Sequence, residues 1–168
     1  MINKIKLNII SNRKLCENEN LEKQIEKIFS AYERKIILKN FEIVALTLRE
    51  KDFNKNEYLK LIEEIYPICQ KYKINLILHQ NYDLNLDDKY KIDGIHLSYS
   101  IFKSLNQNIK AELIKKYKRI GVSIHSLDEA KEVENLGASY VIAGHIFETD
   151  CKKGLKPRGL KFIKDLSS

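Results

Sequence analysis

Residues 119–143 read RIGVSIHSLDEAKEVENLGASYVIA, an apolar run followed by an amphipathic helical pattern and a second apolar run. Ser126 is a residue type that caps helices, and the glutamate three positions later completes a capping box, so a helix is expected to begin here. Gly137 stands where a helix usually ends. The flanking runs, Arg119–Ile124 and Ser139–Ala143, are too apolar to leave one face in water, which predicts buried strands of a parallel sheet.

The same alternation of strand and helix recurs along the whole chain. Six short apolar runs predict strands, at Lys4–Ser11, Glu42–Leu48, Asn75–His79, Asp93–Leu97, Arg119–Ile124 and Ser139–Ala143. Helical patterns lie between them, at Leu21–Tyr32, Lys55–Tyr72, Ile101–Tyr117 and Leu127–Leu136. This alternation predicts an α/β fold, either an open doubly wound sheet or a (β/α)₈ barrel. Nucleotide-binding open sheets lose support because the sequence has neither a GxGxxG nor a GxxxxGK[ST] motif.

Composition places the chain among globular proteins, with 43% hydrophobic and 32% charged residues. Its 168 residues suit one domain with a sizeable core. The net charge of +7 comes mostly from lysines spread along helix faces, which argues against nucleic-acid binding and suits a small anionic substrate. Three cysteines without CxxC spacing indicate neither a disulfide framework nor a zinc site. We expect a cytoplasmic protein with no membrane partner, because no apolar run is long enough for a signal peptide or a membrane span.

Reactive side chains gather in the loop that follows the last predicted strand. This stretch, Gly144–Gly154 (GHIFETDCKKG), contains a histidine, two acids, a threonine, a cysteine and two lysines. Loops at the carboxyl ends of parallel strands surround the crevice in which such folds place their chemistry. His145 is therefore the candidate acid–base residue, because imidazole titrates near neutral pH. Cys151 beside two lysines could be a reactive thiol, but no base partner is evident. The other histidines are also expected at or near strand ends: His79, His96 and His125.

A second polar group follows the second predicted strand. Residues two apart share a face of a strand, so Thr47, Arg49 and Lys51 are expected to point into one cavity. An arginine and a lysine that converge there would bind a phosphate or a carboxylate. Ser123 and His125 share one side of the fifth strand, so either could face the same cavity. The competing interpretation is an ordinary charged loop after a strand.

Four segments have sequences typical of one enzyme family. They are Ala45–Asp52 (ALTLREKD), Asp93–Leu97 (DGIHL), Gly121–Ala130 (GVSIHSLDEA) and Gly137–Gly159. In this order they resemble the thiamine phosphate synthase/TenI family. The last segment, with AGHIFETDCKKGLKPRG, is similar to the TenI branch in particular, which has a histidine where synthases usually have a proline. The resemblance implies a TIM barrel and, for the TenI branch, a thiazole tautomerase of thiamine biosynthesis.

The resemblance also implies roles for individual residues. It assigns His145 the acid–base role in a proton shift that aromatises a carboxythiazole phosphate, a reaction that needs neither metal nor cofactor. Arg49, Lys51, Ser123 and Thr149 are the expected contacts of a small phosphorylated thiazole substrate. We therefore predict a thiazole tautomerase, an isomerase, without a cofactor and without a metal site.

The chain departs from the family at several positions. Thiamine phosphate synthases use two aspartates as magnesium ligands, and here Gln80 and Ile101 occupy those positions. A neutral amide and an alkyl side chain are poor ligands for a hard dication. Thr47 replaces a glutamine of the family. Thiamine phosphate synthase is thus the alternative prediction, together with a non-catalytic relative that senses a ligand or binds a partner.

The family continues with two further strands beyond the last helical residues of this chain. We therefore expect a TIM-barrel-type (β/α) repeat truncated after the sixth strand, forming a single domain over residues 1–168. Such a repeat would leave apolar strand edges at Lys4–Ser11 and Ser139–Ala143. Bare apolar edges favour self-association, so a homo-oligomer is a further expectation.

Overall fold

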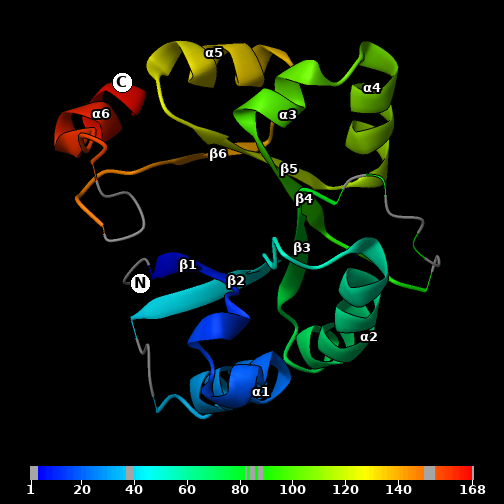
Figure 1. Cartoon of the computed structure of the whole chain (residues 1–168). Coiled ribbons are helices and arrows are strands. Elements are labelled where there is room, and N and C mark those ends of the chain that lie inside the picture. Colours follow the sequence, from blue (N-terminus) through cyan, green and yellow to red (C-terminus); the bar gives the residue numbers. More distant parts are fainter. Residues whose placement is uncertain are drawn as a thin grey trace. The chain divides into compact units, whose positions relative to one another are not determined.

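The α/β architecture expected from the sequence is present, with strands followed by helices along the chain (Figure 1). The computed structural model describes residues 4–36, 40–81, 83, 86, 89–149 and 154–167. It divides into two compact units, Met1–Gly94 and Ile95–Ser168. The expectation that residues 1–168 act as a single domain stays a prediction, and so does the truncation after the sixth strand.

The first unit contains three parallel strands in the order β1-β2-β3. They are β1 (Ile5–Ile10), β2 (Phe41–Leu48) and β3 (Asn75–His79). Two short 3₁₀ helices, η1 (Arg13–Leu15) and η2 (Glu17–Glu19), follow β1, and then come α1 (Leu21–Glu33) and α2 (Lys55–Lys71). Ile10 is in register with Thr47, and Thr47 with Ile77, so the three strands end close together. The polar residues that follow these ends are thereby brought to one edge of the sheet.

Helices α1 and α2 cover one side of these strands (Figure 1). Their apolar stripes supply Ile25, Phe29, Ile62 and Ile65, which pack with the strand residues in one core cluster. Asn54 caps α2 in a reciprocal capping box with Glu57, which explains why the helix begins there.

Tyr58, in the first turn of α2, ties the helix to the strand ends. Its side chain is fully buried. The hydroxyl donates to the carbonyl of Leu48 at the end of β2. The same oxygen accepts a hydrogen bond from the backbone N–H of His79, at 3.2 Å, at the end of β3. One hydroxyl therefore links α2 to two neighbouring strands.

The second unit contains strands in the order β4-β5-β6. They are β4 (Gly94–Ser98), which begins at the last residue of the first unit, β5 (Arg119–Ile124) and β6 (Tyr140–Ala143). Its helices are α3 (Tyr99–Ser104), α4 (Gln107–Lys116), α5 (Leu127–Asn135) and α6 (Gly159–Leu166). β5 and β6 are parallel, with Ser123 opposite Ile142.

Helix α5 starts at the predicted residue, Leu127, and ends one residue before the predicted Leu136. Ser126 accepts a hydrogen bond from the backbone N–H of Glu129 at 3.1 Å, and Gly137 adopts a left-handed φ of +93° after the helix. The capping box is not the reciprocal one that was expected, because the Glu129 carboxylate accepts from the backbone N–H of His125. The predicted helix Ile101–Tyr117 is wrong as a single element. It is split into α3 and α4, because Asn106 caps a new helix by accepting from the N–H of Ile109.

Apolar side chains are exposed on the first and last strands. Ile5 and Ile10 of β1 are 59% and 49% exposed, and Val141 of β6 is 37% exposed. Self-association through these strands stays a prediction. Among the described residues, no helix has both the length and the apolar character needed to cross a bilayer.

Candidate functional site

Glu50 is the centre of a buried polar cluster that follows β1 and β2 in the first unit. Its side chain is only 5% exposed, although it carries an acidic group. The hydroxyl of Ser11 donates to Glu50 Oε1 at 2.7 Å, and the backbone N–H of Arg13 donates to the same oxygen at 3.1 Å. Such donors replace the water that burial removes from a carboxylate. Ser11 Oγ also accepts from the backbone N–H of Arg49 at 2.7 Å, which holds the chain in place after β2.

Arg13 connects this cluster to the surface. Its Nη1 and Nη2 donate to the two oxygens of Asp52 at 2.7 and 2.8 Å, and Nη1 lies 3.3 Å from Glu50 Oε2. The hydrogen bond from Arg13 holds the pKa of Asp52 well below its usual range, and the same pairing raises the pKa of Arg13. Nε lies 3.1 Å from Glu19. The charge of Arg13 is therefore already balanced by acids, and it is a poor candidate for binding an anionic substrate.

Arg49, unlike Arg13, has no acidic partner in the described part of the chain. Its side chain is half-buried directly after β2, and no residue in the described part of the chain forms a hydrogen bond or ion pair with its guanidinium. A guanidinium presents five donors in a planar fork that matches a phosphate or a carboxylate. Arg49 is thus a cation held near the end of a parallel strand with its donors available.

Thr47 and Lys51, the other two residues predicted to face the cavity with Arg49, differ in burial. Thr47 is 1% exposed, and its side chain hydrogen bonds to that of Asn8, with 3.0 Å between Thr47 Oγ1 and Asn8 Nδ2. Lys51 lies in an exposed turn. Since β2 ends at Leu48, the alternation of a strand does not continue as far as Lys51. Arg49 and Lys51 both remain predicted contacts of an anion, at different degrees of exposure.

The second unit contains a buried array around His96. This residue lies inside β4, not at its end, and is 2% exposed. Its Nε2 is 2.8 Å from Ser123 Oγ on β5, and its Nδ1 is 3.3 Å from the hydroxyl of Tyr140 on β6. A Cβ added at Gly121 would lie 2.1 Å from the Tyr140 ring and 2.5 Å from His96 Nδ1, so only glycine fits beneath the two rings.

Burial controls the protonation of this array. It lowers the pKa of His96 to about 4 and, in the opposite sense, raises the pKa of Tyr140 to about 12. Near neutral pH the imidazole is therefore neutral with one N–H, and the phenol keeps its proton. When Tyr140 donates to Nδ1, the N–H is on Nε2 and points at Ser123. The hydroxyl proton of Ser123 is then left for another acceptor.

His145 follows β6 and is half-buried. Its Nε2 lies 3.1 Å from the carbonyl oxygen of Leu155. A carbonyl can only accept, so Nε2 carries a proton and Nδ1 is the nitrogen left for other contacts. Thr149 is exposed, four residues farther along. Over residues 89–149 and 154–167, no hydrogen bond joins His145 to Ser123 or Thr149.

The predicted site residues thus fall into two groups. Arg49 and Lys51 belong to the first unit, whereas Ser123, His145 and Thr149 belong to the second. Within the second unit, the partners of Ser123 and His145 are different residues. Four other residues of the predicted reactive loop lie outside the described residues: Asp150, Cys151, Lys152 and Lys153.

The two positions that the resemblance assigns to magnesium ligands do not fit that ion. Gln80 follows β3 with a left-handed φ of +64°, and its amide oxygen is neutral. Ile101 lies in α3 and has no donor atom. Within the described ranges, no group of three or more His, Cys, Asp or Glu side chains is arranged to hold a metal ion. Hard dications need several charged oxygen ligands, which these positions do not supply.

Sequence reasoning missed several residues of these clusters. Ser11 and Glu50 directly follow neighbouring parallel strands, and this common position was the available signal. Tyr140 was assigned to an apolar strand, and no pattern in the sequence indicates that its hydroxyl faces His96. The Arg13 pair with Asp52 joins residues 39 apart, which no local spacing rule detects.

Comparisons with known proteins place these observations in a family. A family model described as thiamine monophosphate synthase matches residues 7–168. The chain is 31% identical over 163 residues to the thiamine-phosphate synthase of Clostridium botulinum strain Loch Maree, covering 95% of this chain and 72% of that protein. It is 29% identical over 163 residues to the thiamine-phosphate synthase of Clostridium acetobutylicum, covering 97% and 70%.

A solved structure has the same fold. It is the thiamine phosphate pyrophosphorylase from Pyrococcus furiosus, with a TM-score of 0.72 over 98% of this chain and 70% of that one. The two sequences are 22% identical, so this likeness concerns the fold alone.

These findings overturn the principal functional prediction. The relatives are named thiamine-phosphate synthases, which are transferases, and none of these comparisons is specific to the TenI branch. The prediction of a thiazole tautomerase, based on His145 in place of a proline, is therefore wrong. The alternative prediction, thiamine phosphate synthase, is the better supported of the two.

Proposed function

Because the chain belongs to the thiamine monophosphate synthase family, we propose that it is a transferase that makes thiamine phosphate. The reaction joins a thiazole phosphate to a pyrimidine carried on a pyrophosphate ester. The thiazole nitrogen forms the new bond to the pyrimidine methylene carbon, and the bond from that carbon to the pyrophosphate oxygen breaks. Inorganic pyrophosphate leaves with the bonding electrons. Both substrates are small phosphorylated molecules, in agreement with the basic charge of the chain.

The observation that carries this proposal is the state of Arg49. A half-buried guanidinium without a partner in the described part of the chain is suited to an anionic ligand. Ser11 fixes the backbone of Arg49 through the 2.7 Å hydrogen bond, and Glu50 fixes Ser11 in turn. The backbone at Arg49 is therefore held in place before any ligand arrives, which lowers the cost of ordering this segment on binding.

In this proposal Arg49 binds the pyrophosphate and stabilises the negative charge that grows on it as the bond breaks. Lys51, in the neighbouring exposed turn, adds a second cation. No step is assigned to magnesium, because Gln80 and Ile101 do not fit it. Ser123, Thr149 and His145 remain proposed ligand contacts in the second unit, with Ser123 oriented by His96. We further propose that residues 1–168 act as one functional domain.

A non-catalytic relative is the second candidate function. It is favoured by one observation, the neutral amide and the alkyl group at positions 80 and 101. Such a protein would bind a phosphorylated ligand through Arg49 without transferring a group. The two candidates share a binding site and differ only in turnover.

Incubation with both substrates, with and without magnesium, separates them. The transferase predicts thiamine phosphate and pyrophosphate in equal amounts, with turnover abolished or strongly reduced in Arg49→Gln. Arg34→Gln is a matched control, because Arg34 is an exposed arginine at the end of α1. Absence of product together with saturable pyrophosphate binding that Arg49→Gln weakens would establish the non-catalytic candidate. Absence of both would refute the assignment of Arg49.

A further inference from the structure

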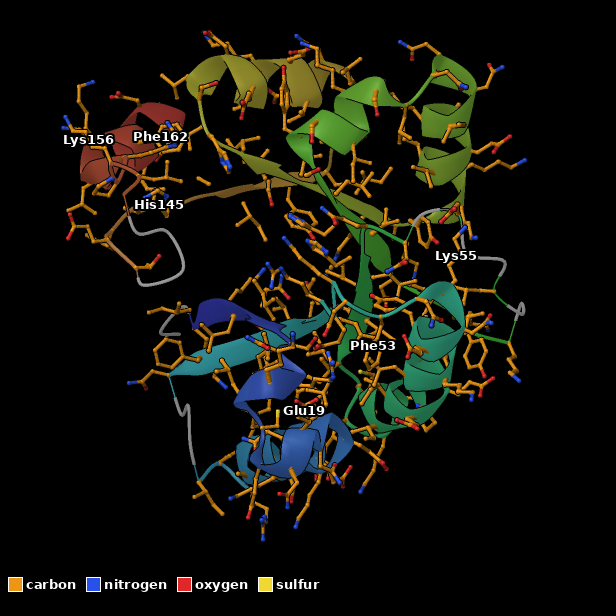
Figure 2. All side chains as sticks on the ribbon, viewed as in Figure 1. Glu19, Phe53, Lys55, His145, Lys156 and Phe162 are labelled. Carbon is orange, nitrogen blue, oxygen red and sulfur yellow. The ribbon has the colours of Figure 1, made fainter. Side chains whose placement is uncertain are left out.

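The second unit contains a pocket of about 410 Å³ whose lining includes none of the residues assigned to the transferase: Arg49, Lys51, Ser123, His145 and Thr149. It lies between the start of α5 and the segment that leads into α6. Its walls are His125, Ser126, Leu127, Lys156, Pro157, Arg158, Lys161, Phe162 and Asp165. Figure 2 shows Lys156 and Phe162 together at α6, with His145 on the loop before it.

The charges in this pocket are unbalanced. Three side chains are cationic and one is a carboxylate. Lys161 Nζ lies 2.6 Å from Asp165, four residues on along α6, so these two are paired with each other. Lys156 has no hydrogen bond or ion pair with any residue in the described ranges. Arg158 uses Nε to donate to the carbonyl of Gly144 at 3.3 Å, which leaves its terminal nitrogens for a ligand.

The backbone holds this basic segment in place. The N–H of Arg158 donates to the carbonyl of His145, and the N–H of Gly159 donates to that of Ile146, both at 3.0 Å. The His145 imidazole donates back to the carbonyl of Leu155 at 3.1 Å. Three hydrogen bonds therefore hold the backbone of this segment against the loop that follows β6. The exposed side chains of Lys156 and Arg158 belong to a backbone that is already in place before a ligand arrives.

The opposite wall adds donors. Ser126 occupies the N-cap of α5 and accepts from the backbone N–H of Glu129. The backbone N–H groups of Leu127 and Asp128, in the first turn of α5, have no acceptor within the helix. The positive end of the helix dipole lies at the same turn. The carboxylate of Glu129 is turned back onto the N–H of His125, and it does not line the pocket.

An apolar surface accompanies the charges. Leu127, Pro157 and the half-buried Phe162 line the same pocket, and the Arg158 guanidinium lies 5.9 Å from the Phe162 ring centroid. Charged donors beside a flat apolar wall are suited to a molecule with an anionic group and an organic body. We propose that this pocket binds a small organic phosphate, with Lys156 and Arg158 on the phosphate group and Phe162 on the organic part.

A pocket in the first unit has the opposite balance of charge, with more acidic than basic side chains. It has a volume of about 440 Å³ and its walls include four glutamates, Glu19, Glu22, Glu57 and Glu64. Its arginine, Arg13, is already paired with Asp52 and Glu19. A concave surface that contains a basic residue is therefore not enough to predict the binding of an anion. The pocket beside α6 differs from the pocket in the first unit because its cations outnumber its acids. The proposal is independent of the transferase activity, because it involves neither Arg49 nor Lys51.

The test is a titration of the whole chain with phenyl phosphate and, separately, with inorganic phosphate, followed by NMR of backbone amides. Phenyl phosphate should produce saturable shifts in the first turn of α5 and in α6. Lys156→Ala should weaken this binding by about tenfold or more, the loss expected for one charge-assisted hydrogen bond. Lys164→Ala is the matched control, because it removes the same charge from an exposed position of α6 outside the pocket and should change affinity less than about twofold.

Two further variants complete the design. Arg158→Gln should also weaken binding about tenfold or more, and unchanged circular dichroism would establish that the fold is intact. Phe162→Ala should remove the preference for phenyl phosphate over inorganic phosphate and leave the affinity for inorganic phosphate unchanged. The proposal is overturned by an absence of saturable binding, by equal effects of Lys156→Ala and Lys164→Ala, or by inorganic phosphate binding as tightly as phenyl phosphate to the unmodified chain.

Discussion

The hydroxyl of Ser11 donates a 2.7 Å hydrogen bond to Oε1 of Glu50, joining the residues that follow two neighbouring parallel strands. Both side chains are almost completely buried. The same hydroxyl accepts from the backbone of Arg49, so the contact supports the cation to which we assign the binding of pyrophosphate.

Ser11→Ala tests this support. Glu50 would lose a donor in a buried position, so the free energy of unfolding should fall by about 1–3 kcal/mol, measured by urea denaturation. Pyrophosphate should also bind more weakly, because the backbone of Arg49 loses its anchor. Ser30→Ala, on helix α1, is the control and should change neither quantity appreciably. Equal stability of Ser11→Ala and the unmodified chain would mean that other donors suffice for Glu50.

His96 should make stability depend on pH. Burial lowers its folded pKa to about 4, whereas the unfolded chain has the ordinary value near 6.5. Between these values the unfolded state binds more protons, so stability is complete above about pH 6.5 and falls as the pH is lowered toward 4. The total loss is on the order of 3 kcal/mol. His96→Gln should flatten this part of the stability curve between pH 5 and 7, and an unchanged slope would remove His96 as its source.

Two tyrosines of the second unit offer a matched pair of variants. Tyr140 has its hydroxyl 3.3 Å from His96, whereas the buried hydroxyl of Tyr117 has no hydrogen-bond partner in the described part of the chain. Tyr140→Phe should destabilise the fold by about 0.5–1.5 kcal/mol, and Tyr117→Phe should be neutral or stabilising because it removes an unsatisfied polar group. Thermal unfolding of both variants is the measurement, and the reverse order would contradict the assignment of partners.

Gly121→Ala should be strongly destabilising. Its Cβ would lie 2.1 Å from the Tyr140 ring and 2.5 Å from Nδ1 of the buried His96, which forces two packed rings to move. Overpacking of this kind costs about 1–3 kcal/mol or more. Gly144→Ala is the control, since no atom lies within 4 Å of its added Cβ. Comparable stability of the two variants would show that the rings can shift at little cost.

Self-association is testable through the exposed strand residues. Ile5 and Ile10 of β1 are 59% and 49% exposed, which favours association in solution. Static light scattering should give a mass that rises with protein concentration. Ile5→Lys should reduce that rise, because a charge on a strand edge opposes pairing. A constant monomer mass over the accessible concentrations would contradict the expectation.

The strands and the ends of α5 could be predicted because their signals are local. Ser126 and Gly137 mark the boundaries of a helix within a few residues of sequence. The break between α3 and α4 was missed because Asn106 was not recognised as a cap within a long amphipathic pattern. The hydrophobic pattern of the sequence predicts where a helix lies, but a capping residue inside that pattern can divide it into two helices.

The candidate site could be predicted only in part. The strand-end positions of Arg49 and His145 follow from counting along the chain, whereas the contacts of Ser11 with Glu50 and of His96 with Tyr140 join residues 39 and 44 apart. The functional error came from a few positions. His145 in place of a proline favoured the tautomerase, and Gln80 and Ile101 disfavoured the synthase, whereas the sequence is similar to thiamine-phosphate synthases over 163 residues.

The hydroxyl of Tyr58 serves both as donor to Leu48 and as acceptor from His79. Phenylalanine fills nearly the same volume but would remove one hydrogen bond from a strand-end carbonyl and one from a strand-end amide. The residue at position 58 is therefore restricted by its hydrogen-bonding capacity as well as by its size. A descendant sequence could lose the tyrosine only if another donor and another acceptor arose together at the ends of β2 and β3, so this position should drift more slowly than the purely apolar core around it.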